Sequence, residues 1–281
     1  RNRIRNDGKY DWNMDNDNVE MEASQKGDIN IDSDLNLAVS NFFSIHPDQD
    51  SLNFRSPKAR FDIKGKKLTC DKIDYITIAD AQIYPDSSRI IIRKKAKIET
   101  LKNAKILANY ITKYHTIYNA EVDIKARMNY KASGTLDYVD EDEKIQNIYY
   151  SDIYPDETYQ TTAIGEIDEK VEFKLSPHFD FRGKVELFAS VADLTFDGEA
   201  KIVHECKNIS TNWIGFKKSI NSKEVYIPID SVVKASNGDV LFSGMVLNTT
   251  DSLSVYSAFL SPLGNKNHIS LMNANGFVHF N

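Results

Sequence analysis

The sequence predicts an all-β protein: a repeat-like curled sheet or β-solenoid, followed by an antiparallel β-sandwich or meander. Three observations lead to this class. Apolar and polar residues alternate along most of the chain, which is the two-residue period of a half-buried strand. Tyrosine and phenylalanine number 14 each, and aromatic side chains favour strands. A short phrase, an alanine followed by one polar residue and then by Ile or Val, recurs through the first half.

Length and charge limit the classes to which the chain can belong. Its 281 residues, of which 41% are hydrophobic, suffice for a sizeable core and for one or two domains. The net charge is −6, and the acidic excess lies in residues 151–281, because acidic and basic residues balance in residues 1–150. A nucleic-acid-binding protein needs a concentrated positive surface, so we expect no nucleic-acid partner.

The sequence lacks the motifs of the common enzyme and metal-site classes. Cys70 and Cys206 form no CxxC pair, which excludes a zinc ribbon or a thioredoxin-like motif and leaves open whether they bridge. No GxSxG, GxGxxG or phosphate-binding loop occurs. We therefore assign no catalytic residue, and a non-enzymatic protein is the better interpretation.

Targeting signals are also missing from the sequence. No apolar run approaches the ~18 residues of a membrane span, so we expect no transmembrane segment. No signal peptide is visible. The chain starts at Arg1 and ends within a predicted strand, so we expect it to be a piece of a longer chain or a processed form.

The first predicted element is a β-hairpin over residues 10–23. The segments KYDWNM and VEMEA alternate on either side of DNDN, a run of residues that tolerate turn conformations. The same stretch has a second interpretation as a calcium site. Asp11, Asn13, Asp15, Asp17 and Glu22 match the oxygen-bearing positions one, three, five, seven and twelve of an EF-hand loop. The flanks alternate like strands rather than helices, so the hairpin is preferred, and we expect no cofactor, with Ca²⁺ as the alternative.

The recurring phrase predicts close packing inside the first half. It places a small residue two positions before a branched one, and residues two apart in a strand share a face. Such pairs suit an interior where layers approach closely, as in a solenoid or a curled sheet. The pairs are Ala81 with Ile83, Ala96 with Ile98, Ala104 with Ile106, and Ala120 with Val122.

Two segments of this half need a separate interpretation. Residues 101–114, LKNAKILANYITKY, also fit helical spacing, but the alternation of the neighbouring phrases favours a strand. The basic run RKKAK, residues 93–97, is interpreted as a solvated edge strand rather than a nucleic-acid contact.

The pattern changes after residue 150, to short alternating runs separated by turn pairs. We predict hairpin turns at Arg182–Gly183, Asp197–Gly198 and Asn237–Gly238. No persuasive amphipathic helix follows residue 150. The predicted division is a repeat-like β domain over residues 1–155 and an antiparallel sandwich or meander over residues 156–281.

A cluster of tyrosines at this junction is the candidate ligand site. Tyr149, Tyr150, Tyr154 and Tyr159 lie close together in sequence, and pockets often form where domains meet. Their rings could stack on a sugar. The competing interpretation is that strand-rich chains are simply rich in tyrosine.

Several segments resemble long, uncharacterised cell-envelope proteins of Bacteroidota with β-repeat regions. The resemblance is carried by SPKARFDI, ADAQIYPDSSRIIIRKKAKI, YHTIYNAEVDI, NYKASGTLDYVDE and LSPHFDFRGKVEL. It implies a much larger exported chain at the cell envelope or cell surface. It brings no known catalytic residues. The first half is also similar in texture to the curled sheets of lipopolysaccharide-transport proteins.

The sequence thus favours a non-enzymatic structural or interaction segment of a large envelope or surface protein. Its expected partners are other envelope proteins or other domains of the same chain. One alternative is a carbohydrate-binding module or glycan-active enzyme on a β-scaffold. Another is a lipid-binding or lipid-conducting groove, which requires an open apolar interior lined by Ile83, Ile98, Ile106 and Val122.

Overall fold

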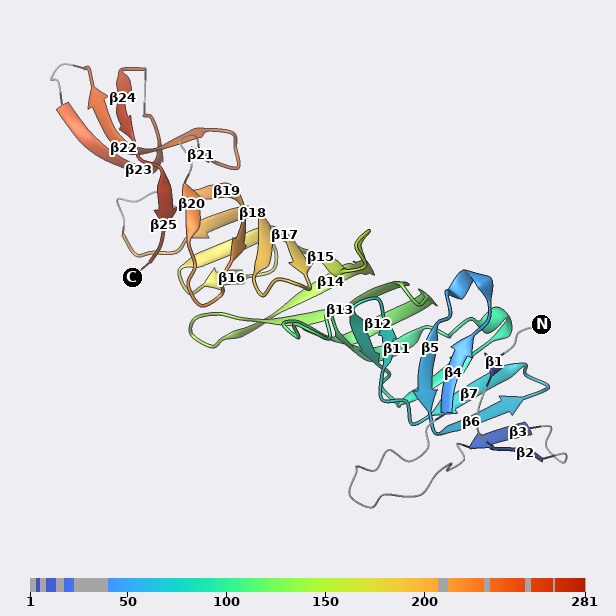
Figure 1. The fold of residues 1–281 in the computed structure, drawn as a ribbon. Helices are drawn as coiled ribbons and strands as arrows, with labels where there is room; N and C mark the ends of the chain where they lie inside the picture. The colour runs from blue at the N-terminus through green and yellow to red at the C-terminus, as the bar shows by residue number, and fades with distance from the viewer. Residues whose placement is uncertain are drawn as a thin grey trace. The chain divides into compact units, whose positions relative to one another are not determined.

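The computed structural model describes residues 4–5, 9–13, 18–22, 40–206, 212–229, 233–250, 254–264 and 266–280 (Figure 1). Strands account for 63% of the structure and helices for 3%. The predicted all-β class is therefore confirmed.

The described elements follow one another along the chain in this order. The first strands are β1 Ile4–Arg5, β2 Lys9–Asn13, β3 Asn18–Glu22, β4 Ser40–Ser44, β5 Asn53–Ser56, β6 Lys58–Asp62, β7 Lys67–Asp71, β8 Ile76–Ile78, β9 Ala81–Tyr84, β10 Arg89–Ile92, β11 Leu101–Leu107 and β12 Thr116–Ala126. They continue as β13 Asn129–Val139, β14 Ile145–Pro155, β15 Thr161–Ile167, β16 Phe173–Ser176, β17 Phe179–Phe188, β18 Leu194–Ile202 and β19 Trp213–Ile220. The last are β20 Ile227–Ile229, β21 Val233–Lys234, β22 Val240–Asn248, β23 Ser254–Pro262, β24 His268–Asn273 and β25 Gly276–Val278. Two 3₁₀ turns, η1 Pro47–Gln49 and η2 Lys94–Ala96, complete the described elements.

The largest sheet is curled and has eleven strands, ten of them in the order β19-β18-β17-β15-β14-β13-β12-β11-β9-β8, with β16 beside β17. A five-stranded sheet runs β10-β7-β6-β3-β2, and smaller sheets join β1-β4-β5, β20-β25, and β21 to β24. Neighbours such as β11 and β12, or β17 and β18, pair antiparallel. A solenoid would stack its strands in parallel, so the curled sheet is the form that the structure adopts.

The chain divides into two compact units, each made of several segments. Unit 1 comprises residues 1–136, 149–163 and 188–192. Unit 2 comprises residues 137–148, 164–187 and 193–281. The boundary predicted near residue 155 falls inside the second segment of unit 1.

The first predicted hairpin is confirmed. Strands β2 and β3 pair antiparallel, with Asp11 opposite Glu20 and Asn13 opposite Asn18. Residues 14–17, which connect the two strands, lie outside the described residues.

The alanines of the recurring phrase lie in the interior, as predicted. Ala81, Ala104 and Ala120 are completely buried, and Ala96 is 6% exposed. Ala104 of β11 lies directly opposite Ala120 of β12, between two register shifts. The strand predicted over residues 101–114 is confirmed for Leu101–Leu107, which form β11, and the helical alternative is excluded there. Residues 108–114 form a turn instead of continuing the strand.

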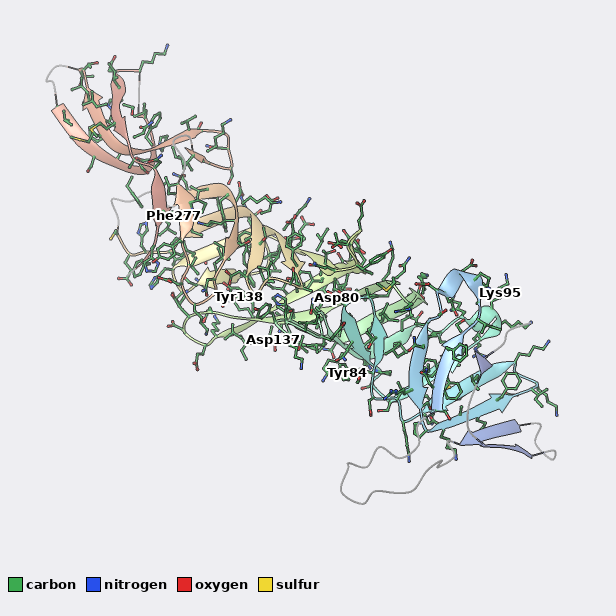
Figure 2. All side chains as sticks on the ribbon, in the orientation of Figure 1. Asp80, Tyr84, Lys95, Asp137, Tyr138 and Phe277 are labelled. Atoms are coloured by element: carbon green, nitrogen blue, oxygen red, sulfur yellow. The ribbon has the colours of Figure 1, made fainter. Side chains whose placement is uncertain are left out.

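The basic run at residues 93–97 is not an edge strand, which corrects its interpretation. Residues Lys94–Ala96 form the 3₁₀ turn η2, and Lys95 is marked there in Figure 2. Lys95 and Ala96 have φ values of 60° and 55°, which break the extended chain. The turn directs Ala96 inward, where its carbonyl accepts a hydrogen bond from Gln49 Nε2 at 2.8 Å. The alternating pattern of this run predicted a strand, but the chain turns here and buries Ala96 instead.

Two of the three predicted turns in the second half are wrong. Gly183 and Gly198 lie inside the continuous strands β17 and β18, directly opposite one another. A Cβ on Gly198 would lie 2.3 Å from the carbonyl oxygen of Arg182, so these glycines allow two backbones to approach closely rather than turn. The third turn is confirmed: Asn237–Gly238 connects β21 to β22, with Ala235 N–H donating to the carbonyl of Asp239 at 2.8 Å.

An aromatic cluster forms the centre of unit 2. The Phe196 ring lies 5.0 Å from Phe181, 5.7 Å from Tyr138 and 6.3 Å from Phe173. All four side chains are buried. Edge-to-face and tilted contacts of this kind add to the free energy of burial, so this cluster anchors β13, β16, β17 and β18.

The four side chains named for the alternative lipid groove lie in the interior of unit 1. Ile83, Ile106 and Val122 are completely buried, and Ile98 is 2% exposed. Burial of these four side chains gives no support to the alternative of an open apolar groove lined by them. Over the described residues, the structure contains no helix long and apolar enough to cross a membrane.

Candidate functional site

Two of the four predicted tyrosines meet at one surface hollow of unit 1. This tyrosine hollow has a volume of about 450 Å³, which falls within the usual range of ligand pockets, about 300–1,000 Å³. Tyr154 lies near the end of β14, and Tyr159 in the turn that leads to β15. The lining residues are Met128, Asn129, Tyr130, Lys131, Asp152, Tyr154, Pro155, Asp156, Glu157 and Tyr159.

The other two predicted tyrosines lie elsewhere, which corrects their assignment to one site. Tyr150 is completely buried, whereas Tyr149 is 58% exposed but does not line the hollow. Consecutive residues of a strand point to opposite faces, so Tyr149 and Tyr150 could not both have faced one ligand. The sequence cluster therefore combined one core residue, one separate surface residue and two hollow residues.

The turn that carries Tyr159 is rigidly built. One carboxylate oxygen of Asp156 accepts hydrogen bonds from Thr158 N–H at 2.8 Å, the Thr158 hydroxyl at 2.7 Å and Gln160 N–H at 3.1 Å. Tyr159 N–H donates to the carbonyl of Asp156 at 2.9 Å. Tyr159 itself has a φ of 62°, a left-handed conformation uncommon for a bulky residue. These bonds fix the backbone at Tyr159, a residue that is 54% exposed.

The rim of the hollow carries a net negative charge. Asp152, Asp156 and Glu157 contribute three carboxylates, against one amine from Lys131. The hydrogen bond from the Thr158 hydroxyl is the largest cause that lowers the pKa of Asp156, so this carboxylate is ionised at neutral pH. Carboxylates accept hydrogen bonds from hydroxyl groups, and their charge disfavours an anionic ligand.

Residues 128–131 were not anticipated as part of the site. Met128 lies in the turn between β12 and β13, whereas residues 129–131 begin β13, which neighbours β14 in the sheet. No local motif marks Met128 or Lys131. Only a correct prediction of the β13–β14 pairing would have placed them beside Tyr154.

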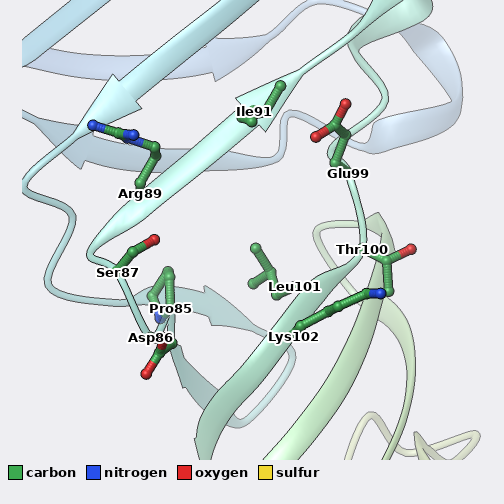
Figure 3. A pocket seen from close by; sticks show the side chains of 9 residues that line it. All are labelled: Pro85, Asp86, Ser87, Arg89, Ile91, Glu99, Thr100, Leu101 and Lys102. Carbon is green, nitrogen blue, oxygen red and sulfur yellow. The ribbon is translucent and has the colours of Figure 1, made fainter.

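A second, smaller hollow lies between β10 and β11. Its volume is about 220 Å³, below the usual range for ligand pockets. Figure 3 shows its lining by Pro85, Asp86, Ser87, Arg89, Ile91, Glu99, Thr100, Leu101 and Lys102. Arg89 is paired with Asp71 at 2.5 Å, and Glu99 with Arg93. These charges stabilise the protein itself, which makes this hollow a weaker candidate than the tyrosine hollow.

A buried polar network lies within unit 1. Asp80, labelled in Figure 2, ends the turn between β8 and β9 and accepts hydrogen bonds from Thr161 and Asn109. The hydroxyls of Tyr130 and Thr161 lie 2.8 Å apart. The carboxylate of Asp80, the Thr161 hydroxyl and Asn109 Nδ2 all have partners in this network. We therefore assign it to stability rather than to catalysis.

Three of the five predicted calcium ligands lie among the described residues. Asp15 and Asp17 lie outside the described residues, while Asp11 and Asn13 belong to β2 and Glu22 to β3. Among the described residues, no group of three His, Cys, Asp or Glu side chains gathers to hold a metal ion. The calcium site stays a prediction. Cys70 and Cys206 are both free thiols.

No protein-family model, curated protein or solved structure matches this chain significantly. The resemblance to envelope proteins therefore stays a prediction. The assignment of a function rests on the geometry of the described residues.

Proposed function

We propose that this protein is a non-enzymatic interaction segment that binds a neutral glycan at the tyrosine hollow. The observation that carries the proposal is the meeting of Tyr154 and Tyr159 with three carboxylates in one hollow of about 450 Å³. Sugars present apolar C–H faces that stack on aromatic rings, and hydroxyl groups that donate to carboxylates. The two kinds of group needed for a sugar are present together.

The charge of the rim narrows the ligand class. With three carboxylates against one lysine, the rim has a net negative charge that repels phosphates, sulfates and uronic acids, because like charges in a confined site weaken binding. Neutral hexoses, or amino sugars that carry a positive charge, avoid this repulsion. We therefore expect uncharged or cationic glycans to bind and sulfated glycans to be rejected.

The state of Asp156 favours a role in binding over a role as the general acid of a glycosidase. A glycosidase needs one carboxylic acid whose pKa is raised, so that it can protonate the leaving group. The pKa of Asp156 moves in the opposite direction, lowered chiefly by the Thr158 hydroxyl. This carboxylate is suited to accept hydrogen bonds from a ligand rather than to donate a proton.

The resemblance to Bacteroidota envelope proteins supplies the context of the proposal. It supports an exported chain at the cell envelope or surface, with envelope proteins or other domains of the same chain as partners. A glycan-binding surface is consistent with that context, since envelopes are rich in polysaccharides. A lipid groove has weaker support, because the side chains proposed to line it are buried.

Titration calorimetry of the whole chain against neutral and sulfated oligosaccharides tests the proposal. Tyr154→Ala and Tyr159→Ala should each weaken binding roughly tenfold, since loss of an anchoring aromatic residue commonly costs more than about 1 kcal/mol. Tyr149→Ala is the matched control: its ring is as exposed as that of Tyr159 but lies outside the hollow. Equal losses in all three variants, or no binding of any neutral glycan at millimolar concentration, would refute the proposal.

A further inference from the structure

The sheet formed by β22, β23 and β24 has one apolar and one polar face. The register places Met245 opposite Met272, and Leu247 opposite both Val255 and Ile269, so these five residues share a face. The opposite face carries Tyr256 and His268, joined by a hydrogen bond of 2.7 Å, along with Asn248, Ser254 and Ser270. The alternation is that of a strand with one side turned to a core.

The apolar face is nevertheless exposed. Met245 is 45%, Val255 51%, Ile269 51% and Met272 65% exposed. Val246, which belongs to the polar face, is only 1% exposed. The apolar face, which the alternation of the strands predicts to be buried, is therefore exposed to solvent. An apolar face of this kind marks an interaction surface.

Charge is absent from three of the four strands of this sheet; the fourth, β21, carries Lys234. No Asp, Glu, Lys or Arg occurs in β22, β23 or β24, although 27% of the chain is charged. Within the described part of the chain, β23 and β24 each pair only with β22, which leaves their outer edges open. Natural proteins usually place charges on open edges and faces to prevent association. The edge strands β23 and β24 carry no such charge.

The lack of charged residues in β22, β23 and β24 indicates what kind of partner can cover the apolar face. A lipid surface is the less suitable occupant, because faces that bind membranes carry Lys or Arg for anionic headgroups. A partner with charges at the contact would leave them buried and unpaired, which is costly. A second copy of the same face satisfies both conditions, since it is equally apolar, uncharged and self-complementary under two-fold symmetry.

We propose that two copies of this chain associate by packing the apolar faces of their β22–β24 sheets against each other. Stacked sheets lie roughly 10 Å apart with interdigitated side chains. Met245, Val255, Ile269 and Met272 of each copy form the contact. Of the sandwich or meander predicted for residues 156–281, this packing would form a sandwich between two molecules.

Light scattering coupled to size-exclusion chromatography of the whole chain, between roughly 1 and 100 µM, tests the proposal. The native chain should shift from monomer to dimer across this range. Val255→Lys and Ile269→Lys should weaken association at least tenfold, because each buries a charge in the contact. Ser254→Lys is the matched control, since it adds the same charge to the neighbouring residue on the polar face, and it should dimerise like the native chain.

Three outcomes would overturn the proposal. The first is a native chain that stays monomeric at the highest concentration. The second is a Val255→Lys chain that keeps native circular dichroism and still dimerises, or a Ser254→Lys chain that loses association equally. The third is a monomer that co-sediments with neutral phosphatidylcholine vesicles through the same residues, which would assign the face to lipid. None of these outcomes bears on glycan binding at the tyrosine hollow, so the two proposals are tested separately.

Discussion

One carboxylate oxygen of Asp80 accepts hydrogen bonds from both the backbone N–H of Thr161, at 2.9 Å, and its hydroxyl, at 2.6 Å. The two residues are 81 positions apart in sequence. The other carboxylate oxygen accepts from Asn109 Nδ2 at 3.1 Å. Because the Thr161 hydroxyl donates to Asp80, the hydroxyl of Tyr130 must donate to Thr161. Asp80 thus joins the β8–β9 turn to the end of β11 and the start of β15.

Asp80→Asn should destabilise unit 1 by about 1–3 kcal/mol, the usual cost of leaving buried polar groups unpaired. An asparagine can keep one oxygen toward Thr161, but its NH₂ then faces the NH₂ of Asn109. Asn109 cannot simply rotate, because its oxygen accepts from the N–H groups of Ile111 and Thr112. Denaturant unfolding measures the loss. Asp86→Asn, in an exposed turn, should change stability by less than about 0.5 kcal/mol.

The stability contributed by Asp80 should decline as pH rises. Burial is the largest influence on this carboxyl and raises its pKa above 3.8, although hydrogen bonds from Thr161 oppose the shift. The folded state then binds the proton more tightly than the unfolded state, so stability is lost between pH 3.8 and the higher folded pKa. The difference in unfolding free energy between the native chain and Asp80→Asn should shrink from pH 3 to pH 7. A difference that grows over this range would contradict the pKa direction.

Phe196→Ala should cost unit 2 about 3–5 kcal/mol, as large-to-small changes in a core usually do. The ring is completely buried among three other aromatic residues, so its removal leaves a cavity. Phe259→Ala, which removes a 41% exposed ring from the same unit, should cost less than half as much. Thermal and denaturant unfolding followed by near-ultraviolet circular dichroism distinguish the two.

Gly198→Ala should destabilise the β17–β18 pair by about 1–3 kcal/mol, the cost of overpacking. The added Cβ would meet backbone atoms, the Arg182 oxygen at 2.3 Å and the Gly183 Cα at 2.8 Å, which cannot move aside as a side chain could. Gly215→Ala provides the comparison, because its nearest contact would be the Gly198 oxygen at 4.0 Å. If both variants unfold at the same denaturant concentration, the close approach of the two backbones is not tight.

Only one of the two thiols should react in the native protein. Cys206 is exposed, whereas Cys70 is buried and burial raises its pKa to about 12. The thiolate is the reactive form, so Cys70 is protected both by access and by protonation. A colorimetric thiol assay should detect one thiol in the native chain and two after denaturation. Cys206→Ser should remove the native signal, and a rapid reaction of Cys70 would show that β7 opens locally.

Sequence patterns predicted the features that depend on residues near one another. The buried pairs such as Ala104 with Ile106 follow from alternation, since a two-residue period assigns each side chain to a face. The turn at Asn237–Gly238 follows from local backbone preferences. Gly183 and Gly198 carry the same local signal as a turn, and only their pairing across two strands shows that they serve a close backbone approach.

The candidate site was predicted in part for the same reason. Tyr154 and Tyr159 are near neighbours in sequence, so a tyrosine cluster indicated them. The bulge-like change of burial along β14, from the buried Tyr150 to the exposed Asp152 and the buried Ile153, could not be foreseen from composition. Lys131 reaches the hollow through strand pairing, which a single sequence does not reveal.

The interleaving of the two units determines how the gene can be divided. A fragment beginning at residue 156 would contain Phe196, Phe181 and Phe173 but would lack Tyr138, whose ring completes their cluster. The Tyr138 hydroxyl also donates to the carbonyl of Leu175 at 2.8 Å, a bond that such a fragment would lose. To produce unit 2 separately, the fragment must be circularly permuted or must start before residue 137. A cut near residue 155, where the sequence pattern changes, would remove part of this unit.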